Sequence, residues 1–465
     1  METTTLRVLE FYSGIGGLRY SLEDSGVNAV VVEAFDINDV GNDVYQHNFG
    51  HRPNQGNIQG LSVKQLDKYK ADAWLLSPPC QPYTRQGLQK DADDARAISF
   101  LKMLEMLPLM MSPPSYLLVE NVVGFENSVT HSRLLAVLKE AEFTTQEFIL
   151  TPLQFGIPYS RPRYFCLAKR NTLPFLDPTY NGQLLCEPGP LLQCQGYQHS
   201  PALNVEKGNK SVEKGNKSVR LAVLEEKSNA LSNRNDEQKA MRNEPILDPA
   251  VICRPVRDFL ETVPSASEES QSKSSAITEV TLSEQDSGKR VRLDPGCPAQ
   301  IRSLEIAELL TSDGRENSGI CKEDQFHTYR VPTNVVQRWI DAYDIVTPDS
   351  RRCCCFTKSY TRYAKGTGSF LAMTVNIKEG TETSVAKHIA NMRAEGQPLD
   401  VLDLRYFTPR EVANLHSFPQ NFRFPVHVKL KQRYALLGNS LSVAVVSGLL
   451  KYLFSSAAKT ERTVS

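Results

Sequence analysis

A cysteine that directly follows two prolines is the first candidate for chemistry in this sequence. The stretch is SPPCQPYTR, Ser77 to Arg85, and it follows the apolar run Ala73–Leu76, which predicts a short buried strand. Each proline fixes its φ at about −65° and removes a backbone donor, so Cys80 stands in a rigid loop. A thiol held in such a loop suits a nucleophile. The alternative is a small buried hydrophobe, which is the usual role of a free cysteine.

A glycine loop, FYSGIGGL, follows a predicted strand and opens a predicted helix, which favours binding of a nucleotide or nucleoside. It does not form the dinucleotide pattern G-x-G-x-x-G, because Arg19 and Tyr20 fill the region of the third glycine. S-adenosylmethionine has no pyrophosphate to seat, so the loop favours this cofactor. Asp36 ends the next strand 19 residues after Gly17 and could accept both ribose hydroxyls, with Ile37 against the adenine. A plain glycine turn and a surface aspartate are the alternative.

Two more motifs lie beside predicted strands. Glu120 follows the apolar run Tyr116–Val119, and ligands of parallel sheets bind at the carboxyl ends of strands. Arg161 and Arg163 flank a proline just before another strand, where alternate residues of an extended chain point the same way. Two guanidinium groups on one face suit a phosphate or a base carbonyl. The alternative for Glu120 is a helix cap or a surface charge. The alternative for Arg161 and Arg163 is a pair of ordinary solvated side chains.

The elements that must position these residues alternate along the first part of the chain. Strands are predicted at residues 7–12, 29–36, 73–76, 115–122 and 163–170, and helices at residues 97–110 and 132–143. Strands that alternate with helices predict a parallel, doubly wound sheet. The glycine loop, Asp36, Cys80 and Glu120 would then share the carboxyl edge of that sheet. Towards the other end, Thr408 followed by Pro409 is typical of a helix start.

The chain changes character after about residue 185. The polar motif VEKGNKS occurs twice in succession from residue 205, and a serine-rich stretch begins at residue 265. These compositions predict disorder at residues 200–247 and 265–320. Between the two segments, Pro255–Leu260 predicts a short docking helix.

The composition limits the classes of function. The 465 residues carry 53 Lys and Arg against 53 Asp and Glu, so any nucleic-acid surface must be local. The start has no basic-then-apolar signal peptide, and the longest apolar run near the end is too short to cross a bilayer. The ten cysteines form no C-x-x-C pair, and the adjacent Cys353–Cys355 lack metal-ligand spacing. We therefore expect a cytoplasmic or nuclear protein with no membrane segment and no metal.

Six motifs taken together give a more specific indication. FYSGIGG, Asp36, PPCQ, ENV, SRPRYF and GNSLSVAVV follow one another in this order. The set resembles the cytosine-5 methyltransferase family. Three details resemble the branch of that family that acts on aspartate tRNA: PPCQPYTR, the Cys355-Phe356-Thr357 signature within RCCCFTK, and LRYFTPREVANLHSFP.

The resemblance covers about residues 5–190 and 325–455, and it implies a fold. This is the α/β, Rossmann-like fold of class I S-adenosylmethionine-dependent methyltransferases, with a mostly parallel sheet and one antiparallel strand. A small target-recognition domain would be inserted, dividing the chain into residues 1–190, 191–390 and 391–457, with the last segment completing the catalytic domain. Tyr83 departs mildly from the family, which usually has Phe at this position.

The resemblance also implies a covalent mechanism on cytosine. The Cys80 thiolate would add to carbon 6, Glu120 would protonate or hydrogen-bond ring nitrogen 3, and Arg161 and Arg163 would hold the pyrimidine carbonyl or a nearby phosphate. S-adenosyl-L-methionine would supply the methyl group and leave as S-adenosyl-L-homocysteine. The implied cofactor-binding residues are Ser13, Gly14, Ile15, Gly16, Gly17, Asp36, Ile37, Ile58, Gln59, Ser77, Asn439 and Ser440. The implied substrate-binding residues are Arg85, Cys355, Phe356, Thr357, Lys358 and Lys365.

The expected partner is a tRNA, specifically tRNA(Asp), bound by a monomer. Basic residues gather at residues 351–365 and 423–433, where they could grip phosphates on either side of a target base. Cytosines of an anticodon loop are unpaired or weakly stacked, so extruding one costs less than in a duplex. Three alternatives stay open: a DNA cytosine-5 methyltransferase, a non-catalytic RNA-binding protein with this fold, and a nicotinamide oxidoreductase. The sequence does not indicate which base removes the carbon-5 proton.

Overall fold

The larger part of the molecule is a mixed eight-stranded sheet with the order β3-β2-β1-β4-β5-β7-β6-β8. A computed structural model describes residues 4–79, 95–194, 245, 247, 251–261, 326–363, 365–374 and 385–455. The strands are β1 Leu6–Phe11, β2 Ala29–Asp36, β3 Asn54–Gln55, β4 Ala73–Leu76, β5 Tyr116–Val122, β6 Phe143–Leu150, β7 Arg163–Arg170 and β8 Leu184–Leu185. β7 runs antiparallel to both of its neighbours, β5 and β6, while the other pairs are parallel. The predicted mostly parallel sheet with one antiparallel strand is confirmed.

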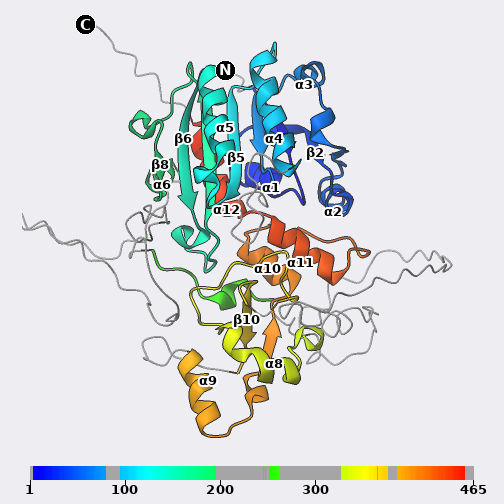
Figure 1. The fold of residues 1–465 in the computed structure, drawn as a ribbon, viewed down its shortest axis with the longest axis vertical. Helices are drawn as coiled ribbons and strands as arrows, with labels where there is room; N and C mark the ends of the chain where they lie inside the picture. Colours follow the sequence, from blue (N-terminus) through cyan, green and yellow to red (C-terminus); the bar gives the residue numbers. More distant parts are fainter. Residues whose placement is uncertain are drawn as a thin grey trace, which may run out of the picture.

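Helices cover both faces of this sheet (Figure 1). One face carries α1 Gly17–Asp24, α6 Gly189–Cys194 and α12 Val443–Phe454, which share a core with the strands. The other face carries α3 Val63–Tyr69, α4 Ala95–Met106 and α5 Val129–Glu140. α2 Asp39–Phe49 connects β2 to β3. This three-layer arrangement is the class I methyltransferase fold.

The central strands are apolar on both sides because both sides are covered. Leu9 of β1 and Trp74 of β4 pack into the core beneath α4 and α5. Their chain neighbours Val8 and Leu75 pack into the opposite core, beneath α1 and α12. Alternate residues of a strand face opposite ways, so a strand covered on both faces appears as an uninterrupted apolar run. Leu430–Phe454 is long and apolar enough to cross a membrane, but 72% of its apolar 18-residue window is buried inside the protein, as a core segment is.

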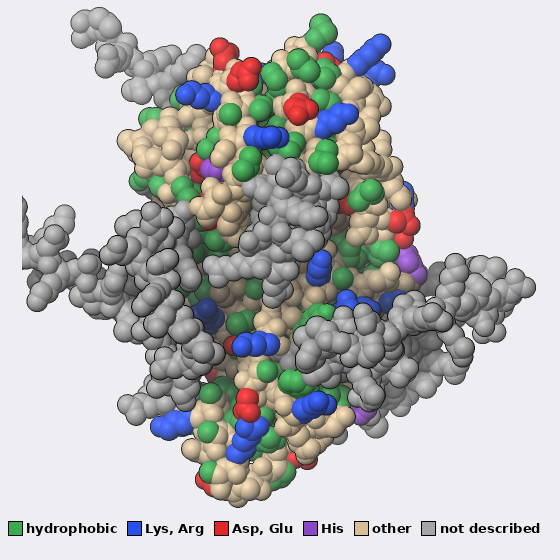
Figure 2. Space-filling view, viewed as in Figure 1, with side chains coloured by type: hydrophobic (Ala, Val, Ile, Leu, Met, Phe, Trp, Pro, Cys, Tyr) green, Lys and Arg blue, Asp and Glu red, His purple; other side chains and the backbone are tan. Residues whose placement is uncertain are grey.

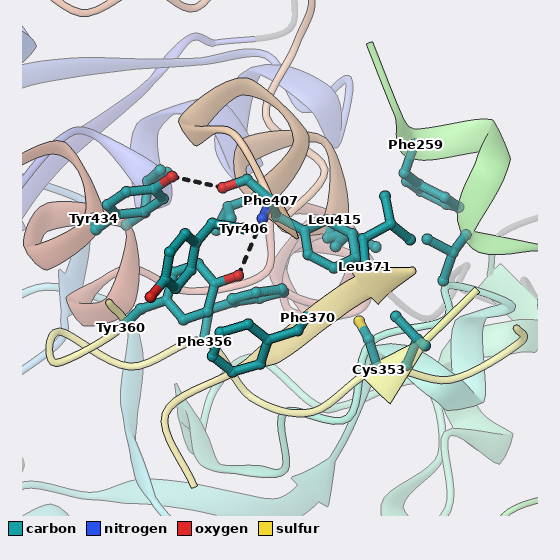
Figure 3. Close-up of a cluster of buried hydrophobic side chains, with 14 of the residues drawn as sticks. Phe259, Cys353, Phe356, Tyr360, Phe370, Leu371, Tyr406, Phe407, Leu415 and Tyr434 are labelled. Carbon is teal, nitrogen blue, oxygen red and sulfur yellow. Dashed lines mark hydrogen bonds between the residues drawn. The ribbon is translucent and has the colours of Figure 1, made fainter. Parts of the chain in front are cut away.

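A second, smaller domain surrounds a three-stranded sheet with the order β11-β10-β9. Its core is aromatic, and Figure 3 shows Phe356, Tyr360, Phe370 and Tyr406 packed together. The Tyr434 hydroxyl donates to the Phe407 carbonyl at 2.6 Å, and the Phe407 N–H donates to the Tyr360 hydroxyl at 3.0 Å. The elements are α8 Thr333–Trp339, β9 Asp344–Val346, β10 Ser369–Ala372, α9 Val385–Ala394, β11 Leu404–Tyr406, α10 Pro409–Leu415 and α11 Leu430–Asn439.

Short 3-10 helices connect the main elements. They are η1 Ile58–Gly60, η3 Leu107–Leu109, η4 Phe125–Asn127, η5 Pro152–Phe155, η6 Pro178–Tyr180, η7 Val256–Phe259, η9 His327–Tyr329, η10 Ile340–Ala342 and η11 Leu399–Leu402. The predicted docking helix is η7, in which Val256 and Phe259 are buried. The side-chain amide of Asn414 in α10 donates to the Phe259 carbonyl at 2.9 Å, which fastens this segment to the small domain.

The segment 391–457 is divided between the two domains. β11 pairs antiparallel with β10 of the small sheet, whereas α12 packs against α1 beside the large sheet. Within this segment, β11 therefore belongs with the small sheet and α12 with the large one. Thr408 does begin α10 as predicted, since its side chain accepts from the Glu411 N–H in a capping box. The segments predicted to be disordered lie outside the described residues, apart from residues 245 and 247.

Candidate active site

A cavity of about 470 Å³ opens at the carboxyl ends of β1, β2, β4 and β5. Every predicted cofactor residue except Gly16 lines it, from the glycine loop to Ser440. Glu120, Arg161 and Arg163 line the same cavity, and so do Pro78 and Pro79. Cys80 and Arg85 lie outside the described residues. The sequence motifs therefore converge on one site, with the chain leading to Cys80 in its wall.

The glycine loop is shaped by two backbone requirements. Gly14 and Gly16 have φ of 53° and 85°, in the region that favours glycine. A Cβ on Gly16 would collide with the ring of Phe49, so Gly16 serves helix packing rather than the cavity. The Gly14 N–H donates to Asp36 Oδ2 at 2.8 Å, which joins the loop to the end of β2.

The remaining groups in this half of the cavity fit an adenosyl moiety. The other oxygen of Asp36 accepts from the Asn38 N–H at 2.7 Å, and because a carboxylate has about four lone-pair sites, the group can still accept from a ribose hydroxyl. Burial raises the pKa of Asp36, while these backbone N–H groups oppose the shift. Ser13 Oγ is buried and has no hydrogen-bond partner among the described residues. Ile37 is 69% exposed at the cavity and offers an apolar face for a base.

Glu120 occupies the other half of the cavity. It lies within β5, which ends at Val122 as the strand predicted at residues 115–122 does, and the residue is 8% exposed. Desolvation raises the pKa of Glu120, although the charges of Arg163 and Arg161 oppose the shift. Arg163 Nε lies 3.6 Å from Glu120 Oε1. A carboxyl group with a raised pKa can hold the proton that a hydrogen bond to a ring nitrogen needs.

Arg161 and Arg163 have different surroundings. The Arg161 guanidinium donates to the Phe356 carbonyl at 3.2 Å and to the Gly438 carbonyl at 3.0 Å, and it also bonds the Ser440 carbonyl. Arg161 thus joins the loop that contains Phe356 to the end of α11. Arg163 donates to the Pro162 carbonyl at 2.7 Å. The geometry favours Arg163 as the group for a pyrimidine carbonyl, and Arg161 as a positioning residue.

Among the described predicted substrate residues, Cys355, Thr357 and Lys358 contact residues of the cavity wall. Phe356 is 1% exposed and packs in the aromatic core, so it supports the rim from within (Figure 3). Arg161 donates to Cys355 Sγ at 3.2 Å. Burial alone would raise the pKa of the Cys355 thiol, but the Arg161 and Arg163 charges lower it below its usual range. The backbone of Thr357 and Lys358 packs against Gly438, and Lys365 is exposed.

The cavity residues that the sequence analysis did not predict include Tyr12, Asn57 and Ser99. The Tyr12 and Ser99 hydroxyls share a hydrogen bond of 3.0 Å, which connects the glycine loop to α4. Tyr12 has φ of 59°, unusual for a residue with a side chain. The sequence offered one signal for Ser99, because it is a serine within the apolar helix AISFLKM. The sequence offered no signal for Asn57, because this residue stands in an irregular polar loop.

Comparison with known proteins assigns this geometry to a family. Residues 6–455 match the family described as C-5 cytosine-specific DNA methylase. The chain belongs to this family. A tRNA (cytosine(38)-C(5))-methyltransferase from Homo sapiens is 36% identical, over 97% of this chain and 99% of its own length. A DNA (cytosine-5)-methyltransferase from Dictyostelium discoideum is also 36% identical, over 97% of this chain and 94% of its own.

Solved structures also place this chain among the C-5 cytosine methylases. The Schizosaccharomyces pombe Dnmt2 methyltransferase is 29% identical with a TM-score of 0.60, covering 97% of this chain and 98% of that one. A Spodoptera frugiperda DNMT2 mutant is 28% identical with a TM-score of 0.61, covering 97% of this chain and all of that one (100%). The nicotinamide oxidoreductase is excluded, because C-5 methylases use S-adenosylmethionine, which the buried Ser13 hydroxyl, Asp36 and Ile37 fit.

Replacing Asp36 with alanine should weaken binding of S-adenosylhomocysteine to the methylase. The variant loses acceptors for the ribose and also the support of Gly14. Hydrogen bonds to a charged group contribute about 1.5–3 kcal/mol, so the Kd should rise roughly 10- to 100-fold by isothermal titration calorimetry. Asp39→Ala is the matched control, since this exposed carboxylate pairs with Arg52 on the surface. Equal Kd values for the two variants would contradict this cofactor seat.

Replacing Gly438 with alanine should destabilise the methylase, although alanine is the better helix former by about 1 kcal/mol. Gly438 lies in α11, and a Cβ there would collide with the backbone of Thr357 and Lys358. Overpacking typically costs about 1–3 kcal/mol, so the melting temperature and the rate of methyl transfer should both fall. Gly189→Ala is the control, because a Cβ on this helical glycine meets open space. A more stable Gly438→Ala protein would show that the rim does not rest on α11.

Proposed function

We propose that this C-5 methylase transfers a methyl group to carbon 5 of a cytosine in the anticodon loop of tRNA(Asp), through a covalent bond to Cys80. One observation carries the proposal: Glu120 and Arg163 share a single cavity with the glycine loop and Asp36. The chain that leads to Cys80 passes along this cavity through Pro78 and Pro79. The human relative named for cytosine 38 of tRNA matches nearly the full length of both chains.

The residues of the cavity divide the chemistry among them. The Cys80 thiolate forms a bond to carbon 6 of the cytosine, and the displaced electron pair makes carbon 5 nucleophilic. The Glu120 carboxyl holds a proton against ring nitrogen 3, which stabilises the charge that develops there. Arg163 binds the ring carbonyl. S-adenosylmethionine, held by the glycine loop and Asp36, supplies an electrophilic methyl group. Loss of the carbon-5 proton and elimination of Cys80 restore the aromatic ring.

The small domain supports RNA as the substrate. Lys358, Arg362 and Lys365 are exposed beside the cavity rim, and Lys429 and Lys431 are exposed at the start of α11. Figure 2 shows Lys and Arg side chains on both sides of the hollow between the two domains. The described part of the small domain has a three-stranded sheet, which offers little surface for reading a DNA groove. An unpaired loop base costs less to extrude than a duplex base.

A DNA cytosine-5 methyltransferase is the second candidate. The Dictyostelium discoideum relative bears that name at the same 36% identity as the human tRNA enzyme, so relatedness alone does not separate the substrates. A non-catalytic RNA-binding protein is disfavoured, because such a protein has no need for a buried carboxyl group beside an arginine in the cofactor cavity.

Competition between the two polymers tests the proposal. Equal concentrations of total tRNA and unmethylated duplex DNA are incubated with the protein and one labelled methyl donor, and label is counted in each polymer. We expect label in the tRNA, with a rate that falls steeply as salt is added, because phosphate contacts release counterions. Comparable labelling of the DNA would favour the second candidate.

A further inference from the structure

Tyr363 is an exposed aromatic residue in a domain whose other aromatic side chains are mostly buried. Its exposed fraction is 49%, whereas Phe356 and Tyr360 on the same loop are 1% and 2% exposed. Figure 3 shows Phe356 and Tyr360 within the aromatic core. The loop thus turns two of its rings inwards and leaves the third at the surface.

Hydrogen bonds hold the loop in this shape. The Thr357 N–H donates to the Thr367 carbonyl at 2.9 Å, and the Thr367 hydroxyl donates to the Tyr363 carbonyl at 2.7 Å. The buried Tyr360 hydroxyl donates to the Ser369 carbonyl at 2.7 Å. Between Tyr360 and Tyr363, Thr361 has φ of 70°, a conformation that β-branched residues rarely adopt. The surrounding contacts must maintain this conformation, so the outward position of Tyr363 is built into the fold.

The same loop sits on the rim of the active site. Its first residues, Thr357 and Lys358, pack directly against Gly438, which lines the cavity. Arg161, also in the cavity wall, bonds both the Phe356 and Gly438 carbonyls and fastens the two segments together. The loop that carries Tyr363 is therefore joined at its base to the wall of the cavity.

One cation lies against the exposed ring, and two more are exposed on the same loop. Arg362 places its guanidinium carbon 5.9 Å from the centre of the Tyr363 ring, and Lys358, Arg362 and Lys365 are all exposed. An aromatic face among cations is the arrangement with which proteins bind single-stranded nucleic acid, stacking on a base and pairing with its phosphates. A tyrosine that is merely solvated would not require the left-handed backbone of Thr361 or the neighbouring cations.

We propose that Tyr363 is a stacking platform for an unpaired RNA base next to the target cytosine, with Lys358, Arg362 and Lys365 on the adjacent phosphates. This inference rests on the proposed function, since it needs a single-stranded loop at the rim. Stacking on a neighbouring base would hold the loop open while the cytosine enters the cavity. Tyr363 would then act on substrate binding and register, separately from the chemistry of Glu120.

The test uses the full-length protein and an anticodon stem-loop RNA in which 2-aminopurine replaces each unpaired base near the target in turn. Wild type should quench the fluorescence at one position, and Tyr363→Phe should keep the quenching because the ring remains. Tyr363→Leu should lose the quenching and bind the RNA about tenfold more weakly. Tyr180 lies on the far edge of the large sheet beside β8, so Tyr180→Leu should match wild type in quenching and affinity.

The outcomes separate this inference from the function on which it rests. If wild type binds and methylates the RNA but quenches no position, or if Tyr363→Leu matches wild type in quenching and affinity, the stacking role of Tyr363 is wrong. The wild-type scan decides this even if the leucine variant fails to fold. If wild type neither binds nor methylates the RNA, the proposed function itself is wrong.

Discussion

Replacing Cys80 with alanine will abolish methyl transfer while S-adenosylmethionine binding persists. Carbon 5 of cytosine is a poor nucleophile until a thiolate adds to carbon 6, so the variant lacks the step that activates the ring. Loss of a catalytic nucleophile typically costs a factor of about 10⁴–10⁶ in rate. The cofactor seat is built by other residues, chiefly the glycine loop and Asp36, so calorimetry should give a Kd near that of wild type. Turnover within tenfold of wild type would refute the covalent mechanism.

Cys355 provides the matched control for this experiment. Its thiol lies 3.2 Å from the Arg161 guanidinium, and the charges of Arg161 and Arg163 lower its pKa against the effect of burial, so it is the described thiol to compare with Cys80. RNA that carries 5-fluorocytosine should trap a covalent complex, because fluorine cannot leave carbon 5 as a proton does. We expect trapping with Cys355→Ala and none with Cys80→Ala. The reverse pattern would make Cys355 the nucleophile.

Replacing Glu120 with glutamine should slow methyl transfer by roughly 10²–10⁴, the usual contribution of a positioned general acid. RNA and cofactor affinities should change little, because the amide is close in size to the carboxyl. Desolvation raises the pKa of Glu120, and the proposed mechanism uses the protonated form, so the wild-type rate should fall as pH rises through that pKa. The glutamine variant should lack this fall, in single-turnover measurements across pH.

Glu140→Gln is the control for this series, since Glu140 is exposed at the end of α5. A wild-type pH profile in both variants would show that Glu120 is structural.

The raised pKa of Glu120 also has a consequence for the stability of the fold. The stabilisation provided by the neutral Glu120 carboxyl is present at low pH and is lost as pH rises through its folded-state pKa. The free energy of unfolding of Glu120→Gln, relative to wild type, should therefore increase with pH.

The large sheet and its carboxyl edge were predictable from local signals. The strands β1, β4, β5 and β7 appear in the sequence as apolar runs because helices cover both faces of the sheet. The period of the apolar residues and the length of each run suffice to find such strands. The glycine loop follows β1, and Asp36 and Glu120 lie towards the carboxyl ends of β2 and β5, so the topology alone brings them together. The start of α10 at Thr408 was predictable because a cap is a property of a few adjacent residues.

The different roles of the two arginines were not predictable. Arg161 and Arg163 are equivalent in an extended segment, and they differ because Arg161 meets Phe356 and Gly438, 195 and 277 residues away along the chain. No local pattern carries such a contact. The burial of Phe356 and the division of residues 391–457 between two domains escaped the sequence analysis for the same reason, since both depend on how β10 and β11 pair.

Methylation of total small RNA followed by mapping of the modified base is the most direct test of the proposed function. The protein is incubated with small RNA and a labelled methyl donor, the labelled species is isolated, and the position of 5-methylcytosine is read by sequencing. We predict a single modified cytosine, in the anticodon loop of tRNA(Asp), made by Cys355→Ala and not by Cys80→Ala. Label spread over many RNAs, or 5-methylcytosine found only when duplex DNA is supplied, would contradict the assignment.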